Sequence, residues 1–286
     1  LPAAPRILAI ESSCDETAAA VIDGDGVLRA DVVASQIDFH ARFGGVVPEI
    51  ASRKHIEAIC GVFDEALCTA GLAPQDLTAV AATYAPGLVG ALVVGVAFAK
   101  GVAWALDVPY IGVNHLEGHL YANKLAEGGF EPPAVVSLVS GGNTMLVHMR
   151  GWGSYEVLGA TIDDAVGEAF DKVAKALGLG YPGGPVISRF AAKGNPHAID
   201  FPRAMLHSGD YRFSLSGLKT AVVTHIQHVR DAEGEEALAA AVPDICASFE
   251  QAVIDVQMMI RSTPATVIHT DRTKEAKNPE EVMPRT

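Results

Sequence analysis

The sequence has few cysteines and no close cysteine pair. Cys14, Cys60, Cys68 and Cys246 are scattered over 286 residues, without a C-x-x-C spacing. Disulfide frameworks and structural zinc sites use closely spaced cysteines, and free cysteines are typical of reducing compartments. The sequence therefore argues against both kinds of site, and we expect a cytoplasmic protein.

Basic residues are also scarce. Lys and Arg total 21 against 34 Asp and Glu, which gives a formal net charge of -13. A chain of this charge does not hold nucleic acid through its bulk charge, so such a role needs a basic partner or a local basic patch. The best candidates for a patch are Arg189, Lys193, Arg203, Arg212 and Lys219. Ordinary solvated surface positions are the alternative explanation for these side chains.

The amino-terminal segment lacks the pattern of a secretory signal. Leu1–Ile10 contains only a short apolar run, and Glu11 and Asp15 follow directly. A signal peptide needs a longer apolar stretch before its cleavage site. We therefore expect no export signal.

One uncharged stretch, Leu77–Ala99, has the length of a membrane span. Pro86 and Gly87 interrupt it near its middle, and this dipeptide is typical of a break between elements. We expect a strand at 78–84 and a Gly- and Ala-rich helix at 87–106, both in a soluble α/β core, and no membrane association.

A strand–turn–strand plan occurs twice in the chain. In each copy a polar turn joins two short apolar runs: Ile7–Ile10, Glu11–Thr17 and Ala18–Ile22, then Val135–Val139, Ser140–Thr144 and Met145–Met149. The spacing is about half the chain, which suggests a duplicated domain. Helical patterns follow each copy, at Pro48–Leu67, Gly87–Leu106, Ile162–Leu177 and Ala237–Met259.

This alternation predicts an α/β fold. The Gly- and Pro-rich stretch at 128–133 marks the expected boundary. We therefore expect a first domain at 1–131, a second at 132–261 and a poorly ordered tail at 262–286, where periodicity is lost.

The segment Asn-His-Leu-Glu-Gly-His contains two candidate metal ligands. In a helix, His115 and His119 share one face at a spacing that suits one metal ion. The segment is not H-E-x-x-H, because the Glu lies at the wrong position for a zincin protease. Two histidines also leave a metal site incomplete. Ordinary surface or core histidines are the alternative.

The turn Val-Ser-Gly-Gly-Asn-Thr could hold a phosphate on its backbone N–H groups. A plain hairpin is the alternative. Repetition of the same plan at Glu11–Thr17 favours the phosphate interpretation. Two hairpin turns that clamp phosphates across a cleft are typical of the actin, Hsp70 and sugar-kinase architecture.

Two further segments have both a functional and an ordinary interpretation. In the first segment, Lys172 follows four acidic residues that would share one helical face: Asp163, Asp164, Glu168 and Asp171. They could order a ribose hydroxyl or a metal, or form a solvated face. The turn Tyr-Pro-Gly-Gly-Pro at 181–185 could let backbone approach a ligand, or be a plain loop.

Seven segments together closely resemble the TsaD family of tRNA threonylcarbamoyltransferases. They are Ile-Glu-Ser-Ser-Cys-Asp-Glu-Thr, Gly-Gly-Val-Val-Pro-Glu-Ile-Ala-Ser-Arg-Lys-His, Asn-His-Leu-Glu-Gly-His, Val-Ser-Gly-Gly-Asn-Thr, Gly-Glu-Ala-Phe-Asp-Lys-Val-Ala, Tyr-Pro-Gly-Gly-Pro and Phe-Ser-Leu-Ser-Gly-Leu-Lys-Thr, in this order. The resemblance extends from about Ile7 to about Gln257.

The resemblance implies a two-domain fold of the actin-like, Hsp70-like ATPase class. It implies transfer of threonylcarbamoyl from threonylcarbamoyl-adenylate to N6 of the adenosine 3′ of the anticodon, with release of AMP. By the same resemblance, His115 and His119 would bind the metal, and Asp15 and Glu16 would be catalytic. The adenylate pocket would include Leu138, Val139, Ser140, Gly141, Gly142, Asp171, Gly184 and Ser188.

The resemblance also implies a cofactor and partners. The cofactor would be one divalent metal ion per subunit, with iron favoured over zinc or magnesium. The partners would be tRNA, a smaller paralogous TsaB-like subunit that forms a heterodimer, and a TsaE-like P-loop ATPase.

The chain departs from the family pattern after Arg261. The family continues into a Gly-Gly-Val-Ala-x-Asn segment that contacts the nucleotide, and later into an Asp-Asn-Ala-x-Met-Ile segment whose Asp completes the metal site. Neither segment occurs here, and the residues around Asp271 do not match. Asn143 replaces the His of the Ser-Gly-Gly-His-Thr pattern, and Leu138 stands where archaeal and eukaryotic relatives have Tyr.

Three alternatives to an active transferase stay open at this point. A catalytically impaired member that only binds partners would lack metal or nucleotide binding. A metalloprotease would need a catalytic Glu beside a zinc histidine, which the sequence lacks. A sugar kinase or ATPase of the same fold would need a sugar pocket, and nothing in the sequence specifies one.

Overall fold

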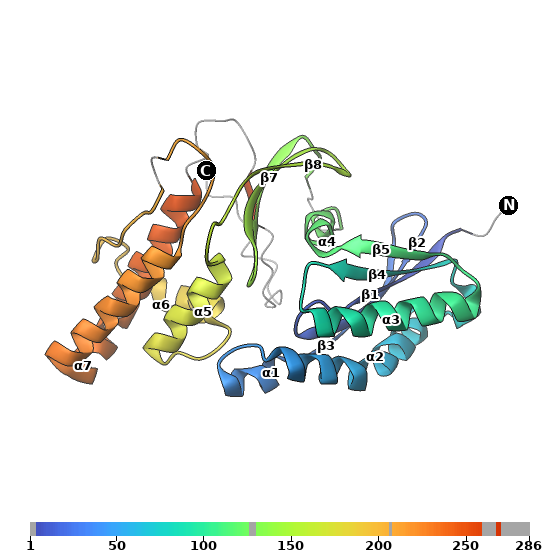
Figure 1. Cartoon of the computed structure of the whole chain (residues 1–286), viewed down its shortest axis with the longest axis horizontal. Helices are drawn as coiled ribbons and strands as arrows, with labels where there is room; N and C mark the ends of the chain where they lie inside the picture. Colours follow the sequence, from blue (N-terminus) through green and yellow to red (C-terminus); the bar gives the residue numbers. More distant parts are fainter. Residues whose placement is uncertain (1–3, 126–129, 206–207, 259–266, 270–286) are drawn as a thin grey trace. The chain divides into compact units, whose positions relative to one another are not determined.

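The computed structural model describes residues 4–125, 130–205, 208–258 and 267–269. The chain divides into two compact units, Leu1–His119 and Leu120–Thr286, each described separately below (Figure 1). The division falls inside helix α4, His115–Ala122. The domain boundary expected after residue 131 stays a prediction. Most of the tail 262–286 lies outside the described residues.

The first unit contains a five-stranded mixed sheet with the order β3-β2-β1-β4-β5. Its strands are β1 Arg6–Glu11, β2 Glu16–Asp23, β3 Leu28–Ser35, β4 Ala79–Ala85 and β5 Tyr110–Asn114. β1, β2 and β3 pair antiparallel, whereas β1, β4 and β5 pair parallel. The predicted first strand–turn–strand copy and the predicted strand at 78–84 are therefore confirmed.

Alternating side chains of β1 define the core face of this sheet. Leu8 is paired with Val21 of β2 and Val80 of β4, and all three side chains are completely buried. Because side chains alternate along a strand, paired residues at this register point to one face. This face forms the core of the first unit.

Two helices cover that face (Figure 1). They are α2 Pro48–Ala70 and α3 Val89–Leu106, which pack on each other and on the sheet. Pro48 suits the first helical position of α2, and Gly71 ends the helix in the left-handed conformation. The short helices are α1 Ile37–His40, η1 Ala41–Phe43 and η2 Pro74–Asp76.

The second unit contains a four-stranded sheet with the order β8-β7-β6-β9. Its strands are β6 Ala134–Val139, β7 Thr144–Gly151, β8 Ser154–Ala160 and β9 Val267–His269. β6 and β7 form the predicted second hairpin, and β9 pairs parallel with β6. All six residues of β6 are buried, as expected for a central strand covered on both faces.

Three helices form the main core of the second unit. They are α5 Val166–Leu177, α6 Gly183–Ala191 and α7 Ser216–Gln257. α7 joins two helices, since Gly234 has non-helical angles (φ 87°, ψ 175°) that glycine adopts without strain. Phe170 of α5 lies against Phe249 of α7, with ring centroids 4.8 Å apart.

The fold therefore belongs to the actin-like α/β class, as predicted. Two helices, α3 and α7, have the length and apolar composition of a membrane span. Core helices of soluble proteins have the same properties, so this is weak evidence. Ala91, Ala99 and Ala103 of α3 are buried in the first unit, which gives one face of that helix a core role.

The helix predicted at 162–177 begins four residues later than expected, at Val166. Asp163 instead accepts hydrogen bonds from the backbone N–H groups of Leu215 and Ser216, at 2.8 and 3.3 Å. This carboxylate satisfies donors at the start of α7, where a negative charge is favourable. The prediction that Asp163 and Asp164 share a helical face with Glu168 was therefore wrong.

The buried ring of Phe249 leads to a stability prediction. Phe249→Ala should lower the free energy of unfolding by about 3–5 kcal/mol, because it removes a fully buried aromatic side chain and leaves a cavity. Ile254→Ala on the same helix, where the side chain is 45% exposed, should cost less than about 1 kcal/mol. Urea unfolding measures the free energy of unfolding of both variants. Equal losses in the two variants would contradict the buried packing of Phe249.

Candidate functional site

The carboxyl ends of three neighbouring strands place polar side chains together in the first unit. Glu11 ends β1, Thr83 lies near the end of β4, and His115 directly follows β5. β1 pairs parallel with β4, and β4 pairs parallel with β5. Ligand sites in such sheets lie outside the carboxyl ends of the strands.

The Glu11 carboxylate is held by several donors. Its Oε1 accepts from the Ser13 backbone N–H at 2.5 Å, and its Oε2 accepts from the Thr83 hydroxyl at 2.5 Å. Oε2 also lies 3.3 Å from Nδ1 of His115. Burial acts to raise the pKa of Glu11, but hydrogen bonds from His115, Ser13 and Thr83 outweigh it and lower the pKa to about 2. Glu11 is therefore ionised at neutral pH.

The two predicted metal ligands, which we term the histidine pair, lie on the first turns of α4. Their spacing of four residues puts both imidazoles on one helical face, as predicted. The Nε2 atoms of His115 and His119 are 3.0 Å apart. Metal–nitrogen bonds of about 2.0–2.1 Å place adjacent ligand atoms about 3 Å apart, so this geometry fits shared ligation.

The surroundings of His119 also suit metal binding. Burial and the neighbouring His115 lower the pKa of His119. The neutral imidazole, which is the form that binds metals, therefore dominates at neutral pH.

Within the described ranges, no group of three or more His, Cys, Asp and Glu side chains has the geometry of a metal site. Asp271 lies outside those ranges.

Asp15 lies in the turn between β1 and β2, and Glu16 is the first residue of β2. His55 of α2 supports this turn, since its Nδ1 lies 2.8 Å from the Thr17 hydroxyl and its Nε2 lies 3.1 Å from the Cys14 carbonyl. Glu16 accepts a hydrogen bond from the Ser35 hydroxyl at 3.2 Å. The buried His55 was not predicted as a supporting residue, although it ends one of the seven motifs.

Cys14 is unsuited to nucleophilic chemistry. Burial and the carboxylates of Asp15, Glu11 and Glu16 raise the pKa of its thiol to about 12. The thiol is therefore protonated at neutral pH, and the thiolate is the reactive form.

The second predicted turn is a tight hairpin between β6 and β7. The Ser140 N–H donates to the Asn143 carbonyl at 2.8 Å, and the Asn143 N–H donates to the Ser140 hydroxyl at 3.1 Å. Gly141 and Gly142 are exposed, and a Cβ on either glycine would meet no atom within 4 Å. The backbone of this turn is therefore accessible to a ligand, whereas the side chain of Leu138 is completely buried.

Helix α5 begins directly against this hairpin. The Gly167 N–H donates to the Ser140 carbonyl at 3.2 Å. A Cβ on Gly167 would lie 2.7 Å from Gly141 Cα and 2.8 Å from the Ser140 carbonyl oxygen. Only glycine allows this approach, which brings the positive end of a helix dipole to the turn. Gly167 was missed as a site residue, although it lies within the Gly-Glu-Ala-Phe-Asp motif.

Asp171 and Gly184, two residues predicted for the adenylate pocket, lie close together in the structure. Asp171 Oδ1 accepts from the Gly183 N–H at 2.7 Å, which fixes the start of α6 against α5. A Cβ on Gly183 would lie 2.5 Å from the Phe170 carbonyl oxygen, whereas one on Gly184 would meet nothing within 4 Å. Ser188, further along α6, donates to Glu250 Oε1 at 2.5 Å.

The predicted basic patch contains two kinds of residue. Arg203 pairs with Asp200 and Asp255, and Lys219 pairs with Asp164, with both basic side chains at least 80% buried. These ion pairs reduce the charge that Arg203 and Lys219 can offer to phosphates. Arg189 and Lys193 are exposed at the end of α6 and just after it.

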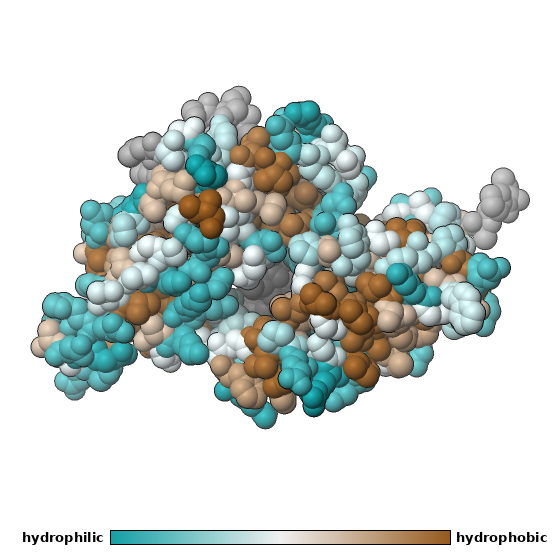
Figure 2. Space-filling view, viewed as in Figure 1, coloured by the Kyte–Doolittle hydropathy of each residue, from teal (hydrophilic) through white to brown (hydrophobic). Residues whose placement is uncertain are grey.

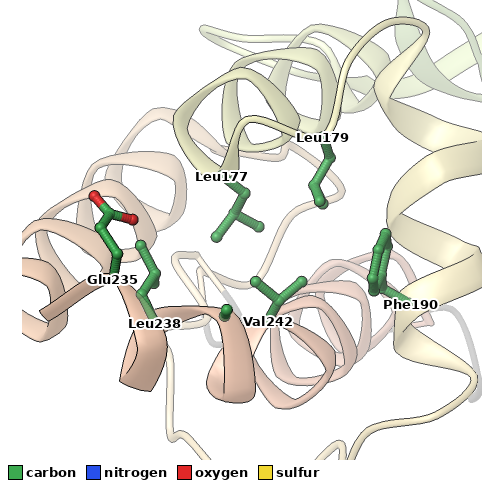
Figure 3. A pocket seen from close by; sticks show the side chains of 7 residues that line it. Leu177, Leu179, Phe190, Glu235, Leu238 and Val242 are labelled. Carbon is green, nitrogen blue, oxygen red and sulfur yellow. The ribbon is translucent and has the colours of Figure 1, made fainter.

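The second unit also contains a hollow of about 270 Å³. It is lined by Leu177, Leu179, Phe190, Glu235, Leu238, Ala239 and Val242 (Figure 3). Its one charged side chain, Glu235, pairs with Arg230 at 2.7 Å. A ligand site normally combines apolar lining with several convergent polar groups, so this hollow is not the candidate site.

The chain thus combines an α/β fold of the actin-like class with a histidine pair and an open Gly-Gly hairpin. The chain matches the family TsaD, tRNA N6-adenosine threonylcarbamoyltransferase, over residues 27–271. The chain belongs to this family. The motif resemblance is lost after Arg261, whereas the family match continues for ten more residues and includes β9.

Relatives with this name are similar over most of the chain. The protein from Clostridium perfringens is 54% identical over 250 residues, which are 87% of this chain and 73% of the relative. The protein from Moorella thermoacetica is 57% identical over 251 residues, which are 88% of this chain and 72% of the relative.

Solved structures give more distant similarities. Component A of (R)-2-hydroxyglutaryl-CoA dehydratase from Acidaminococcus fermentans has a TM-score of 0.49 at 10% identity, covering 93% of this chain and 91% of that one. YeaZ from Pseudomonas aeruginosa has a TM-score of 0.38 at 19% identity, covering 54% of this chain and 67% of that one.

The contact between α5 and the Gly-Gly hairpin leads to a prediction. Gly167→Ala should lower the free energy of unfolding by about 1–3 kcal/mol, because its methyl group overlaps hairpin backbone that cannot move aside cheaply. Gly217→Ala, in the first turn of α7, should be neutral or stabilising, because its methyl group meets open space. Thermal unfolding compares them, and a neutral Gly167→Ala would contradict the contact.

Proposed function

We propose that this chain transfers the threonylcarbamoyl group from threonylcarbamoyl-adenylate to N6 of the adenosine 3′ of the anticodon in tRNAs that read ANN codons. The observation that carries the proposal is the histidine pair, with Nε2 atoms 3.0 Å apart, in a member of the TsaD family. Cytoplasmic location is part of the proposal.

The reaction is an acyl transfer that needs no enzyme nucleophile. The N6 amine forms a bond to the carbamoyl carbon, the bond from that carbon to the phosphate oxygen breaks, and AMP leaves with the electron pair. N6 loses one proton, which is released to solvent. Because the donor is a mixed anhydride, AMP is a good leaving group, and positioning supplies much of the remaining rate enhancement.

The hairpin Ser140–Gly142 is the proposed phosphate site. Its exposed glycines would supply N–H groups, and the start of α5 would supply a helix dipole of the sign that favours an anion. Leu138 and Val139 would contribute backbone only, because their side chains are at most 8% exposed.

The proposed nucleoside contacts come from the start of α6. Asp171 would act by holding Gly183, which leaves Gly184 open to the ligand. Ser188 would lie further from the phosphate, where its hydroxyl is bonded to Glu250.

The histidine pair is the proposed site for one divalent metal ion, with iron favoured over zinc or magnesium. When bound, the metal would supply Lewis-acid stabilisation of developing negative charge. His115 and His119 would hold it through Nε2. Asp15 and Glu16, on the turn that His55 supports, are the proposed catalytic carboxylates.

The proposed tRNA contacts are Arg189 and Lys193, because their exposed charges can meet phosphates. Arg203 and Lys219 would support the fold of this region through their ion pairs, with weaker direct contact. The net charge of -13 means that partners must supply additional positive charge. A smaller TsaB-like paralogue and a TsaE-like ATPase are the proposed partners.

Helix α3 offers the surface proposed for the smaller subunit. Val89, Val93 and Trp104 on its outer face are 77%, 59% and 88% exposed. Figure 2 shows a brown apolar area over the part of the first unit where α3 lies. Exposed apolar areas of this kind are typical of protein interfaces.

A transfer assay tests the proposed activity. The chain is mixed with threonylcarbamoyl-adenylate, unmodified tRNA, a divalent metal and the partner subunits, and the digested tRNA is analysed by mass spectrometry. Threonylcarbamoyladenosine should form, and His115→Ala/His119→Ala should reduce its rate by at least about 100-fold through loss of the metal. His197→Ala/His228→Ala, which removes two exposed histidines, is the matched control.

Two results would contradict the proposal. Full activity of His115→Ala/His119→Ala would remove the histidine pair from the mechanism. Absence of product from the unaltered chain, together with normal binding to the partners, would favour a catalytically impaired, partner-binding member of the family.

The α3 surface leads to a separate prediction about the partner. Trp104→Asp should weaken binding of the smaller subunit by at least about 10-fold, because it places a charge in an apolar interface. Val157→Asp on β8, where the apolar side chain is 59% exposed, should leave affinity unchanged. Titration calorimetry measures the affinity of both variants for the smaller subunit. Equal effects on that affinity would exclude α3 as the docking surface.

A further inference from the structure

Glu11 faces the ring nitrogen of His115 that lies away from the proposed metal. Its Oε2 is 3.3 Å from His115 Nδ1, whereas His115 Nε2 faces His119. The imidazole ring therefore stands between the carboxylate and the proposed metal position. Glu11 is thus placed to act on His115 rather than to bind the metal directly.

The hydrogen bonds around His115 select one tautomer. Nδ1 has two oxygen neighbours, Glu11 Oε2 at 3.3 Å and Ser13 Oγ at 3.1 Å. A carboxylate can only accept a hydrogen bond, so the proton of the neutral ring belongs on Nδ1. Nε2 then keeps its lone pair, directed toward Nε2 of His119.

Glu11 is itself held rigidly. The Thr83 hydroxyl and the Ser13 N–H each donate to it at 2.5 Å, from a neighbouring strand and from the following turn. A carboxylate fixed in this way can define the orientation of a ring as well as its tautomer. Metal-bound histidines commonly have such a carboxylate on the second ring nitrogen, which raises ligand basicity.

We infer that Glu11 is a positioning residue that orients His115 and fixes its Nδ1–H tautomer for metal binding through Nε2. The inference rests on the proposed function, because it requires a metal at the histidine pair. It adds a residue from β1 to a site whose ligands come from α4. It assigns no contact between Glu11 and the metal.

Metal titration tests the inference without any activity measurement. Zn²⁺ affinity is measured by competition with a chromophoric chelator, and Co²⁺ absorption reports the coordination geometry. Glu11→Gln should weaken Zn²⁺ binding by about 10–100-fold and change the Co²⁺ spectrum. Gln disrupts the network in either orientation, because its NH₂ faces either the Ser13 N–H, which only donates, or Nδ1 of His115, where it favours the other tautomer.

Three further variants separate Glu11 from its surroundings. Glu57→Gln, an exposed carboxylate paired with Lys54, is the matched control and should bind Zn²⁺ normally. Ser13→Ala removes the hydroxyl 3.1 Å from Nδ1 but keeps Glu11, so it should weaken Zn²⁺ binding less than Glu11→Gln does. Glu11→Asp preserves the charge but shortens the side chain, so its Zn²⁺ binding should be weakened as well. This variant replaces Glu11→Gln in the titration if Glu11→Gln does not fold.

The tautomer gives a readout that needs no metal. In the metal-free chain, ¹⁵N NMR should show His115 protonated at Nδ1, and Glu11→Gln should show a mixture of tautomers. Normal Zn²⁺ affinity and an unchanged tautomer in Glu11→Gln would overturn the inference about Glu11 but leave the metal proposal standing. Equal Zn²⁺ binding by the unaltered chain and His115→Ala/His119→Ala would overturn the metal proposal and, with it, the inference.

Discussion

Parallel pairing of β1, β4 and β5 is the constraint on which the candidate metal site depends. It brings Glu11, Thr83 and His115, which are up to 104 positions apart in the chain, to one edge of a sheet. No local pattern could produce this meeting, because it needs two crossover connections. The buried apolar face of the same strands, with Leu8 paired to Val21 and Val80, fixes the register that holds these side chains at the edge.

Close backbone approach at glycine is the second constraint, and it acts in both units. A Cβ on Gly87 would lie 2.6 Å from the Ser13 carbonyl oxygen, and one on Gly167 would lie 2.8 Å from that of Ser140. In each case a helix begins against the turn of a hairpin. The same arrangement thus supports the turn with Asp15 and the proposed phosphate turn. This gives a physical reason for the strand–turn–strand plan that the sequence repeats.

Both hairpins, the helical face shared by His115 and His119, and the α/β class could be predicted from the sequence, because each depends on short-range periodicity. The strands β3, β5, β8 and β9 were not identified, and β5 and β8 lack a long alternating apolar pattern. Asp163 was placed on a helix because its spacing of eight residues from Asp171 fits one helical face, but its carboxylate accepts from backbone N–H groups at the start of α7, far along the chain. The support that Glu11 gives to His115 was missed for the same reason, because long-range hydrogen bonds leave no local signal.

X-ray absorption at the metal edge of the loaded protein tests the central claim most directly. The account predicts two imidazole nitrogens at about 2.0–2.1 Å from the metal in the unaltered chain and their loss in His115→Ala/His119→Ala. A metal coordinated by oxygen alone, or imidazole scattering that persists in the double variant, would contradict it. Either of these results would mean that the ends of β1, β4 and β5 converge for a purpose other than holding a metal.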